Sequence, residues 1–214
     1  MPLIVKLVRH GESESNTGKM SAQLAGDHII PLTARGIEQA KAAGKAIGRD
    51  FFTNTLVYSS PYQRTRSTLA GILEGAGIAD GELRTYEDPR LREVEHGYQS
   101  YEEQLELRRT HGWFYYRFEG GESPADCFDR TSNFLESMMR QVERKSAERV
   151  LIVTHGLTIR CFVMRYLHLK VEEFDELANP DNCAIITLGE HAHLPDAAWK
   201  TGKWGVTGLH PRAD

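Results

Sequence analysis

Two histidines in the sequence each follow an apolar run and are themselves followed by glycine. His10 comes after residues 3–8, with Arg9 immediately before it, and His155 comes after residues 150–154. A neutral imidazole is a competent nucleophile near pH 7, and the planar guanidinium of arginine matches phosphate oxygens in a bidentate manner. Imidazoles combined with guanidiniums therefore predict chemistry on a phosphate group.

The apolar runs before these histidines have the composition of buried strands, because they are short and rich in Val, Ile and Leu. Residues 55–59 form a third such run, and Arg64 follows it, with Arg66 as its rival. Parallel strands end along one edge of a sheet, and ligands of α/β proteins bind outside that edge. The histidines and arginines are therefore expected to meet there despite their separation in sequence.

Helical patterns lie between the predicted strands. Residues 33–51 place apolar side chains at three- and four-residue steps behind Thr33 as N-cap, and residues 157–169 show similar periodicity. Ser123 begins another helix that should end near residue 146. This alternation predicts the α/β class, with a mostly parallel central sheet flanked by helices.

The rest of the chain fits the same single domain, which we expect to span residues 1–214. Residues 83–86 predict an outer strand, residues 183–188 a final strand at an edge, and Pro61 the first turn of a helix. Residues 97–122 contain an aromatic patch and predict a small helical or loop cap insertion. The alternative for this segment is a helix and loop packed on the domain surface.

The chemistry also needs a proton donor for the leaving oxygen, and a carboxylic acid can serve if its pKa is raised. Glu93 is the candidate. Spacing alone leaves three rivals, Glu12, Glu87 and Glu95. A helix beginning near Gly156 would add backbone N–H donors for an anion, so Gly156 and Leu157 join the predicted substrate-binding residues.

A metal site is the other interpretation of the remaining histidines. The C-terminal region contains His191, His193, Asp196 and His210. Short polar tails with histidine are more often exposed than metal-binding, and the chemistry above requires no metal. We therefore expect neither a metal nor another cofactor.

Composition limits the partners and the location. The 214 residues carry a net charge of -4, with 40% hydrophobic and 26% charged residues, so nothing favours nucleic acid or an acidic membrane surface. Neither a signal sequence nor a membrane span is evident, which predicts a cytoplasmic protein. Cys127, Cys161 and Cys183 are expected to be reduced and buried. The expected partner is a small phosphorylated substrate, and the sequence carries no signature of an oligomeric state.

A larger set of motifs resembles the histidine phosphatase superfamily. In chain order these are residues 9–13, Asn16, residues 31–33 with Gly36, residues 59–65, residues 91–93 with Gly97, and residues 154–156. They occur in the order of that family and cover most of the chain. The resemblance implies that His10 becomes a phosphohistidine and that Glu93 is the proton donor and later the base for water. It assigns phosphate binding to Arg9, Asn16, Arg64 and His155.

Differences from the mutases of this superfamily favour hydrolysis. Those mutases usually carry Asn after the second His-Gly, where Leu157 stands here, and a Lys where residues 100–103 read Ser-Tyr-Glu-Glu. We therefore predict a phosphomonoesterase, of the histidine acid phosphatase type, acting on a small phosphorylated metabolite through His10. The alternatives are a cofactor-dependent phosphoglycerate mutase and a non-catalytic phospholigand-binding protein. Residues 113–129 and 179–183 resemble a phosphoglycerate-mutase-like branch known from plants and fungi.

Overall fold

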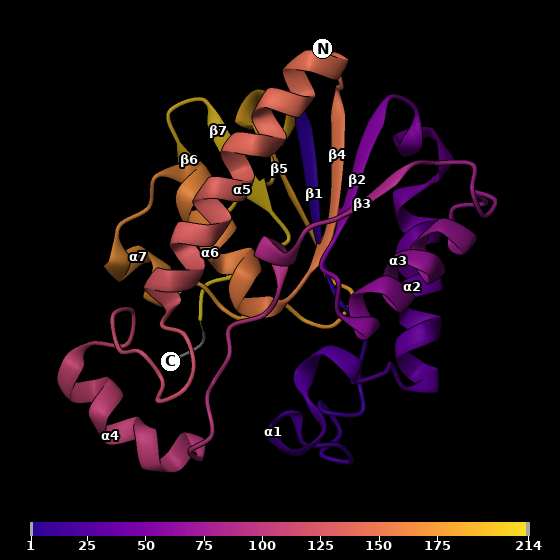
Figure 1. Cartoon of the computed structure of the whole chain (residues 1–214). Coiled ribbons are helices and arrows are strands. Elements are labelled where there is room, and N and C mark those ends of the chain that lie inside the picture. Colours follow the sequence, from indigo (N-terminus) through magenta and orange to yellow (C-terminus); the bar gives the residue numbers. More distant parts are fainter. Residues whose placement is uncertain (1, 213–214) are drawn as a thin grey trace.

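A seven-stranded sheet organises the computed structural model, which describes residues 2–212 (Figure 1). Within this described part of the chain the strand order is β3-β2-β4-β1-β5-β7-β6. The strands are β1 (Ile4–Arg9), β2 (Thr55–Ser59), β3 (Thr85–Glu87), β4 (Arg149–Thr154), β5 (Ile185–Glu190), β6 (Trp199–Thr201) and β7 (Trp204–Thr207).

Most of these strands run in the same direction. β1 pairs in parallel with β4, β4 with β2, and β2 with β3. β5 is antiparallel to both β1 and β7, so β7 runs in the direction of β1, and β6 is antiparallel to β7. The predicted α/β class with a mostly parallel sheet is therefore confirmed. In the register of β1 and β4, Arg9 lies opposite Thr154, so the residues that follow these two strands lie side by side.

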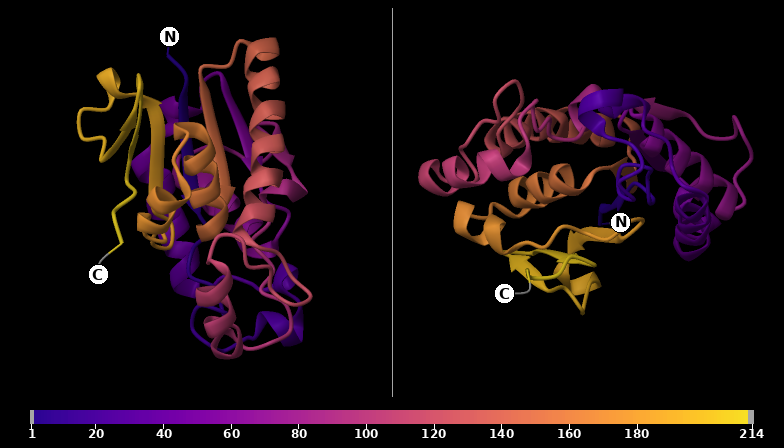
Figure 2. Two further views of the ribbon diagram at one scale, coloured as in Figure 1. Left: turned by 90° about the vertical axis from the view of Figure 1, so that its left-hand side faces the viewer. Right: turned by 90° about the horizontal axis from the view of Figure 1, so that it is seen from below.

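Helices cover both faces of the sheet. Leu56 and Tyr58 of β2 point into a core with α5 (Pro124–Lys145) and α6 (Gly156–Leu167), whereas Val57 points into a second core with α2 (Ala34–Ile47) and α3 (Gln63–Gly75). Figures 1 and 2 show these two layers. The shorter elements are α1 (Ala22–Ala25), α4 (Tyr101–His111), α7 (Val171–Glu176) and the 3-10 helices Asp27–Ile29, Arg49–Phe52, Pro89–Leu91 and His191–His193.

The helix starts follow local capping chemistry. The Thr33 side chain accepts a hydrogen bond from the Gly36 N–H, and Ser123 forms a reciprocal capping box at the start of α5. α3 begins at Gln63 with Tyr62 as N-cap, so the prediction that Pro61 lies in its first turn was wrong.

Gly44 lies where α2, which contains two glycines, packs against α3. A Cβ at Gly44 would lie 2.1 Å from the Ile72 carbonyl oxygen of α3, so only glycine permits α2 and α3 to approach this closely. The close approach compensates for the poor helix propensity of glycine, because it lets the two helices pack together over the sheet.

The C-terminal third differs from the prediction. β5 is an interior strand between β1 and β7, not an edge strand, because the expected polar tail continues into the hairpin of β6 and β7. This hairpin escaped the sequence analysis because its strands are short; Gly202, in the left-handed region with φ 57°, lies in the turn between them.

Residues 97–122 contain α4 and a loop beyond the carboxyl ends of the parallel strands, on the side where α1 also lies (Figure 1). Its aromatic patch mostly turns inward: Phe114 and Phe118 are buried in the core with α5 and α6, whereas Tyr115 is exposed. None of the described helices has the length and apolar character needed to cross a membrane.

Candidate active site

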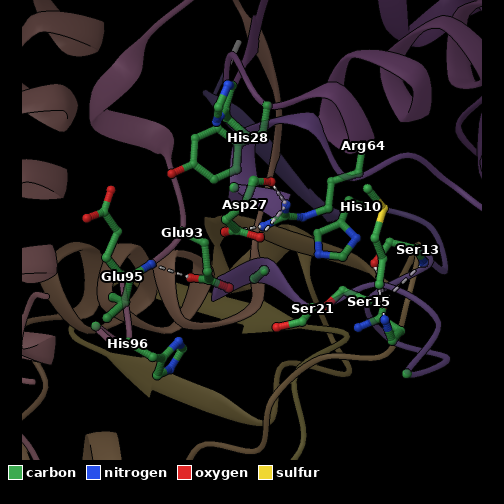
Figure 3. Close-up of a pocket in the computed structure, with 18 of the residues that line it drawn as sticks. His10, Ser13, Ser15, Ser21, Asp27, His28, Arg64, Glu93, Glu95 and His96 are labelled. Atoms are coloured by element: carbon green, nitrogen blue, oxygen red, sulfur yellow. Dashed lines mark hydrogen bonds and ion pairs between the residues drawn. The ribbon is translucent and has the colours of Figure 1, made fainter. Parts of the chain in front are cut away.

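A pocket of about 730 Å³ lies at the carboxyl end of β1 (Figure 3). Its wall comes from distant parts of the chain, because several loops meet beyond the edge of the sheet. The contributing stretches are residues 9–28, 62–64 and 93–98, together with Gly120. Arg9, His10 and Arg64 line this pocket, and His155, which is not part of its wall, lies against His10, so the structure brings the four predicted residues together.

The imidazole of His10 is buried, with 4% of its surface exposed, and is held in one orientation. Its Nδ1 lies 2.8 Å from the carbonyl oxygen of Gly11, and a carbonyl only accepts, so Nδ1 carries the hydrogen. Burial, and secondly the positive charge of Arg64, lower the pKa of His10 to about 3. At neutral pH the ring is therefore uncharged and Nε2 has a free lone pair, which suits a nucleophile.

The second histidine lies directly behind the first. The ring centroids of His10 and His155 are 5.3 Å apart, and His155 is completely buried. Its Nε2 is 2.9 Å from the hydroxyl of Ser60, whereas its Nδ1 is buried without a hydrogen-bond partner. Burial and then the charge of Arg64 lower the pKa of His155 well below its usual value. His155 is thus a neutral group with one unused nitrogen.

The guanidinium of Arg9 has one nitrogen that is hydrogen-bonded and one that lacks an acceptor. Its Nη1 donates to the Pro180 carbonyl at 2.7 Å, while Nε is buried without an acceptor among the described residues. A buried donor without a partner is unfavourable, and an anion bound in front of His10 would relieve it. Burial lowers the pKa of Arg9 from its usual value, which reflects the desolvation of this guanidinium.

Arg64 is held by a carboxylate that the sequence analysis did not identify. Its Nη1 and Nη2 lie 2.8 Å and 2.9 Å from the two carboxylate oxygens of Asp27, and Nη1 also donates to the Asp27 carbonyl at 2.6 Å (Figure 3). Asp27 thus occupies the terminal fork of a side chain that is only 4% exposed. None of the described residues accepts from Nε, so that edge of the guanidinium is still available to an anion. The rival Arg66 is exposed and paired with Glu87.

Glu93 also lines the pocket, on a loop that is fixed by side chains from other elements. Its Oε1 accepts from the Val94 N–H at 3.0 Å and from the Thr158 hydroxyl at 3.3 Å. Three backbone carbonyls of this loop accept hydrogen bonds from side chains of other elements. Arg130 Nη1 donates to the Arg90 carbonyl at 2.7 Å, Thr154 Oγ1 to the Leu91 carbonyl at 2.7 Å, and Thr158 Oγ1 to the Arg92 carbonyl at 2.8 Å. This anchoring fixes the position of the carboxylate.

The rival acids are separated by their contacts. Glu12 accepts from the Thr33 hydroxyl at 2.8 Å and pairs with Arg35, and it does not line the pocket. Glu87 is engaged by Arg66 on the surface. Glu95 lines the pocket, as Glu93 does. Of the four candidate acids, these two therefore lie within reach of a bound ligand.

Asn16 lies in the pocket wall, whereas the residues after His155 do not. The Asn16 Oδ1 accepts from the Ser13 N–H at 3.1 Å and from Asn182 Nδ2 at 3.2 Å, which leaves its amide N–H groups to donate. α6 begins at Gly156, as predicted, and the Leu157 side chain packs in the core with α5, so a substrate contact through the Leu157 backbone N–H stays a prediction. Gly156 packs against Asn179, whose Oδ1 would be 2.4 Å from a Cβ at that position.

The sequence analysis missed three residues that contact the predicted site residues, because no local sequence pattern indicates these contacts. Ser60 contacts His155, Asp27 contacts Arg64, and Asn182 Nδ2 donates to the His10 carbonyl at 3.0 Å. Ser60 belongs to the Ser-Ser-Pro motif at the end of β2, which marks its location without indicating its contact. Asp27 has no such signal.

The histidines of the C-terminal region do not line the pocket, and no group of three or more potential metal ligands occurs among residues 2–212 for which side chains are described. The groups that converge in the pocket are therefore imidazoles, guanidiniums and carboxylates of the chain itself. Together they can attack, bind and protonate a phosphate ester.

This combination at the edge of an α/β sheet defines a phosphoryl-transfer site built on histidine. Residues 5–200 match the family model of the histidine phosphatase superfamily (branch 1), and the chain belongs to that superfamily.

Individual relatives agree with this assignment. The chain is 38% identical to the phosphoglycerate mutase-like protein AT74H of Arabidopsis thaliana, over 88% of this chain and 75% of that protein. It is 26% identical to the broad-range acid phosphatase DET1 of Saccharomyces cerevisiae, over 87% of this chain and 85% of the relative. A mycobacterial glucosyl-3-phosphoglycerate phosphatase, solved with VO3, has the same fold, with a TM-score of 0.71 at 21% identity and 96% coverage of both chains.

Proposed function

We propose that the protein is a phosphomonoesterase that hydrolyses a small phosphorylated metabolite through a phosphohistidine on His10. The observation that carries the proposal is the state of His10: its Nδ1 hydrogen is directed to the Gly11 carbonyl, so a neutral ring presents Nε2 to a pocket with two guanidiniums. A nucleophile in this state needs no activation by a separate base.

In the first step Nε2 of His10 attacks phosphorus and the bond from phosphorus to the ester oxygen breaks. Arg9 and Arg64 stabilise the charge on the equatorial oxygens, and the unused Nδ1 of His155 and Nε of Arg9 gain an acceptor. The carboxyl group of Glu93 donates its proton to the leaving oxygen.

In the second step the roles of the acid are reversed. The Glu93 carboxylate takes a proton from water as the water oxygen bonds to phosphorus and the bond to Nε2 breaks. Inorganic phosphate leaves and the neutral imidazole is restored. Asn16, whose amide N–H groups are unused, is a further phosphate contact in this scheme.

The relatives support hydrolysis, since the yeast protein is an acid phosphatase by name. We extend this to an acid-type phosphatase, because a nucleophile with a pKa of about 3 stays neutral in mildly acidic solution. A cytoplasmic location and a cap role for residues 97–122, which contribute Gly97, Tyr98 and Gly120 to the pocket, belong to the same proposal.

The test is hydrolysis of p-nitrophenyl phosphate, with His10→Ala as the variant and His191→Ala as the control outside the pocket. We expect His10→Ala to lose about three orders of magnitude or more in turnover and His191→Ala to lose nothing. Quenching the wild-type reaction should trap an acid-labile, base-stable phosphoenzyme. Near-normal hydrolysis by a folded His10→Ala variant would refute the proposal.

The same preparation separates hydrolase from mutase. Incubation with 3-phosphoglycerate and a bisphosphoglycerate primer should yield free phosphate, not the isomeric phosphoglycerate. Rapid isomer formation would favour the mutase, which shares the phosphohistidine but shields it from water.

A further inference from the structure

The positive charge in the pocket is confined to the place where the phosphoryl group binds. Of the described residues in the wall, only Arg9 and Arg64 carry a permanent positive charge, and both act on His10 electrostatically. Asp27 already occupies the terminal fork of Arg64. The remaining positive charge is therefore matched to one phosphate group and leaves none for a second anion.

The outer wall is acidic. Asp27, Glu93 and Glu95 line the same pocket. Asp27 is paired with Arg64, and Glu93 carries the proton for the leaving oxygen in the proposed first step, so Glu95 supplies the negative charge that is left over. Glu95 is exposed, and its carboxylate has no hydrogen-bond or ion-pair partner among the described residues. Figure 3 shows Glu95 on the opposite side of Glu93 from His10.

Nearby cations outside the wall do not offset the charge of Glu95. Arg92 is on the same loop as Glu93, but its guanidinium is paired with Glu122, and it is not part of the wall. Desolvation lowers the pKa of His96 from its usual value, and Arg108, whose charge also acts on His96, is buried and is not part of the wall. An anionic leaving group would therefore face the unpaired carboxylate of Glu95.

The other groups of the outer wall are hydrogen-bonding side chains without a permanent charge. They are Ser15, Ser21, His28, Tyr62, His96 and Tyr98. Burial first, and then the carboxylates of Asp27 and Glu95, raise the pKa of Tyr62 to about 12, so it keeps its hydroxyl hydrogen. Such groups match the hydroxyls of a polyol or sugar.

From this charge distribution we infer the substrate class: the protein acts on phosphomonoesters of neutral polyhydroxy alcohols and discriminates against leaving groups that carry a second acid. The inference rests on the proposed phosphatase function and specifies its substrate. Glu95 is a specificity residue in this account, because its carboxylate meets the leaving group and not the phosphate.

The experiment compares glycerol 3-phosphate with 3-phosphoglycerate, which differ by a carboxylate in place of a hydroxymethyl group. At pH 8, above the usual range of histidine pKa values, we expect kcat/KM to be at least about tenfold higher for glycerol 3-phosphate. Glu95→Lys should reduce this ratio at least about fivefold. Glu143→Lys, on the exposed surface of α5 outside the pocket, makes the same change of net charge and should leave the ratio unchanged.

The ratio cancels any effect of a substitution on steps that both substrates share. Equal efficiency on the two substrates, or a ratio that Glu95→Lys does not alter, would overturn the inference while hydrolysis of p-nitrophenyl phosphate upholds the proposed function. Absence of p-nitrophenyl phosphate hydrolysis by the wild type would overturn the proposed function and the inference with it.

Discussion

Ser60→Ala tests whether the second histidine must be held in place. Ser60 and His155 are both completely buried, and the 2.9 Å contact between them is the only hydrogen bond of the His155 ring, because Nδ1 has no partner. Removing the hydroxyl leaves both ring nitrogens unsatisfied. An unsatisfied buried polar group costs about 1–3 kcal/mol, so the free energy of unfolding should fall by about that amount.

The same loss should appear in catalysis. If the freed ring turns away from the position in which it meets the phosphoryl group, transition-state stabilisation falls by a similar amount. Since each 1.36 kcal/mol is tenfold in rate, we expect kcat/KM for p-nitrophenyl phosphate to fall about 10- to 100-fold. Urea unfolding and steady-state kinetics measure the two effects separately.

Ser59→Ala is the matched control. Ser59 is equally buried, and its hydroxyl donates to the Ser60 carbonyl at 2.7 Å without touching His155. It should destabilise the protein similarly but leave kcat/KM within about threefold of the wild type. Equal kinetics for the two variants would refute the reasoning. A double-mutant cycle with His155→Ala should show that the loss from Ser60→Ala disappears when the imidazole is absent.

Three further predictions follow from other parts of the structure. Arg64→Gln should lower kcat/KM by about two to three orders of magnitude, whereas Arg66→Gln, two residues along the same helix, should change it less than about twofold; equal effects would contradict the placement of Arg64 in the pocket. Because protonated His10 cannot attack and its pKa is about 3, this residue should not reduce kcat/KM between pH 7 and pH 5, and a loss with a midpoint near 6.5 that is traced to His10 would argue against its burial. Gly44→Ala should lower the free energy of unfolding by about 1–3 kcal/mol in urea titrations despite the higher helix propensity of alanine, because the new methyl group meets the Ile72 carbonyl; a stabilised variant would show that α2 and α3 can separate freely.

The predictable parts of the molecule are those whose physics is local. The apolar runs of β1 and β4 identify buried strands without knowledge of their neighbours, and Thr33 and Ser123 cap helices through bonds to residues three positions along. Because strands of one parallel sheet end at one edge, the meeting of His10 with Arg64 followed from topology alone.

The unpredictable parts depend on contacts between distant segments. Asp27 reaches Arg64 through a loop whose path no periodicity describes, and β5 became an interior strand only because β7 pairs with its outer side. The direction of the Leu157 side chain was likewise not predictable, because a side chain near the start of a helix can point either to the ligand or to the core. Only the packing of α6 against α5 decides between these directions.

The loop that carries Glu93 has a consequence for how the family can diversify. Each of the three consecutive backbone carbonyls from Arg90 to Arg92 accepts a hydrogen bond from a side chain of α5, β4 or α6. Glu93, the proton donor of our proposal, is therefore held by the same elements that position the second histidine, and residues 97–122 come after it in the chain. A change in the length or sequence of residues 97–122 to suit a new metabolite would therefore leave Glu93 in place, so substrate selectivity and the proposed chemistry can evolve on separate segments of one chain.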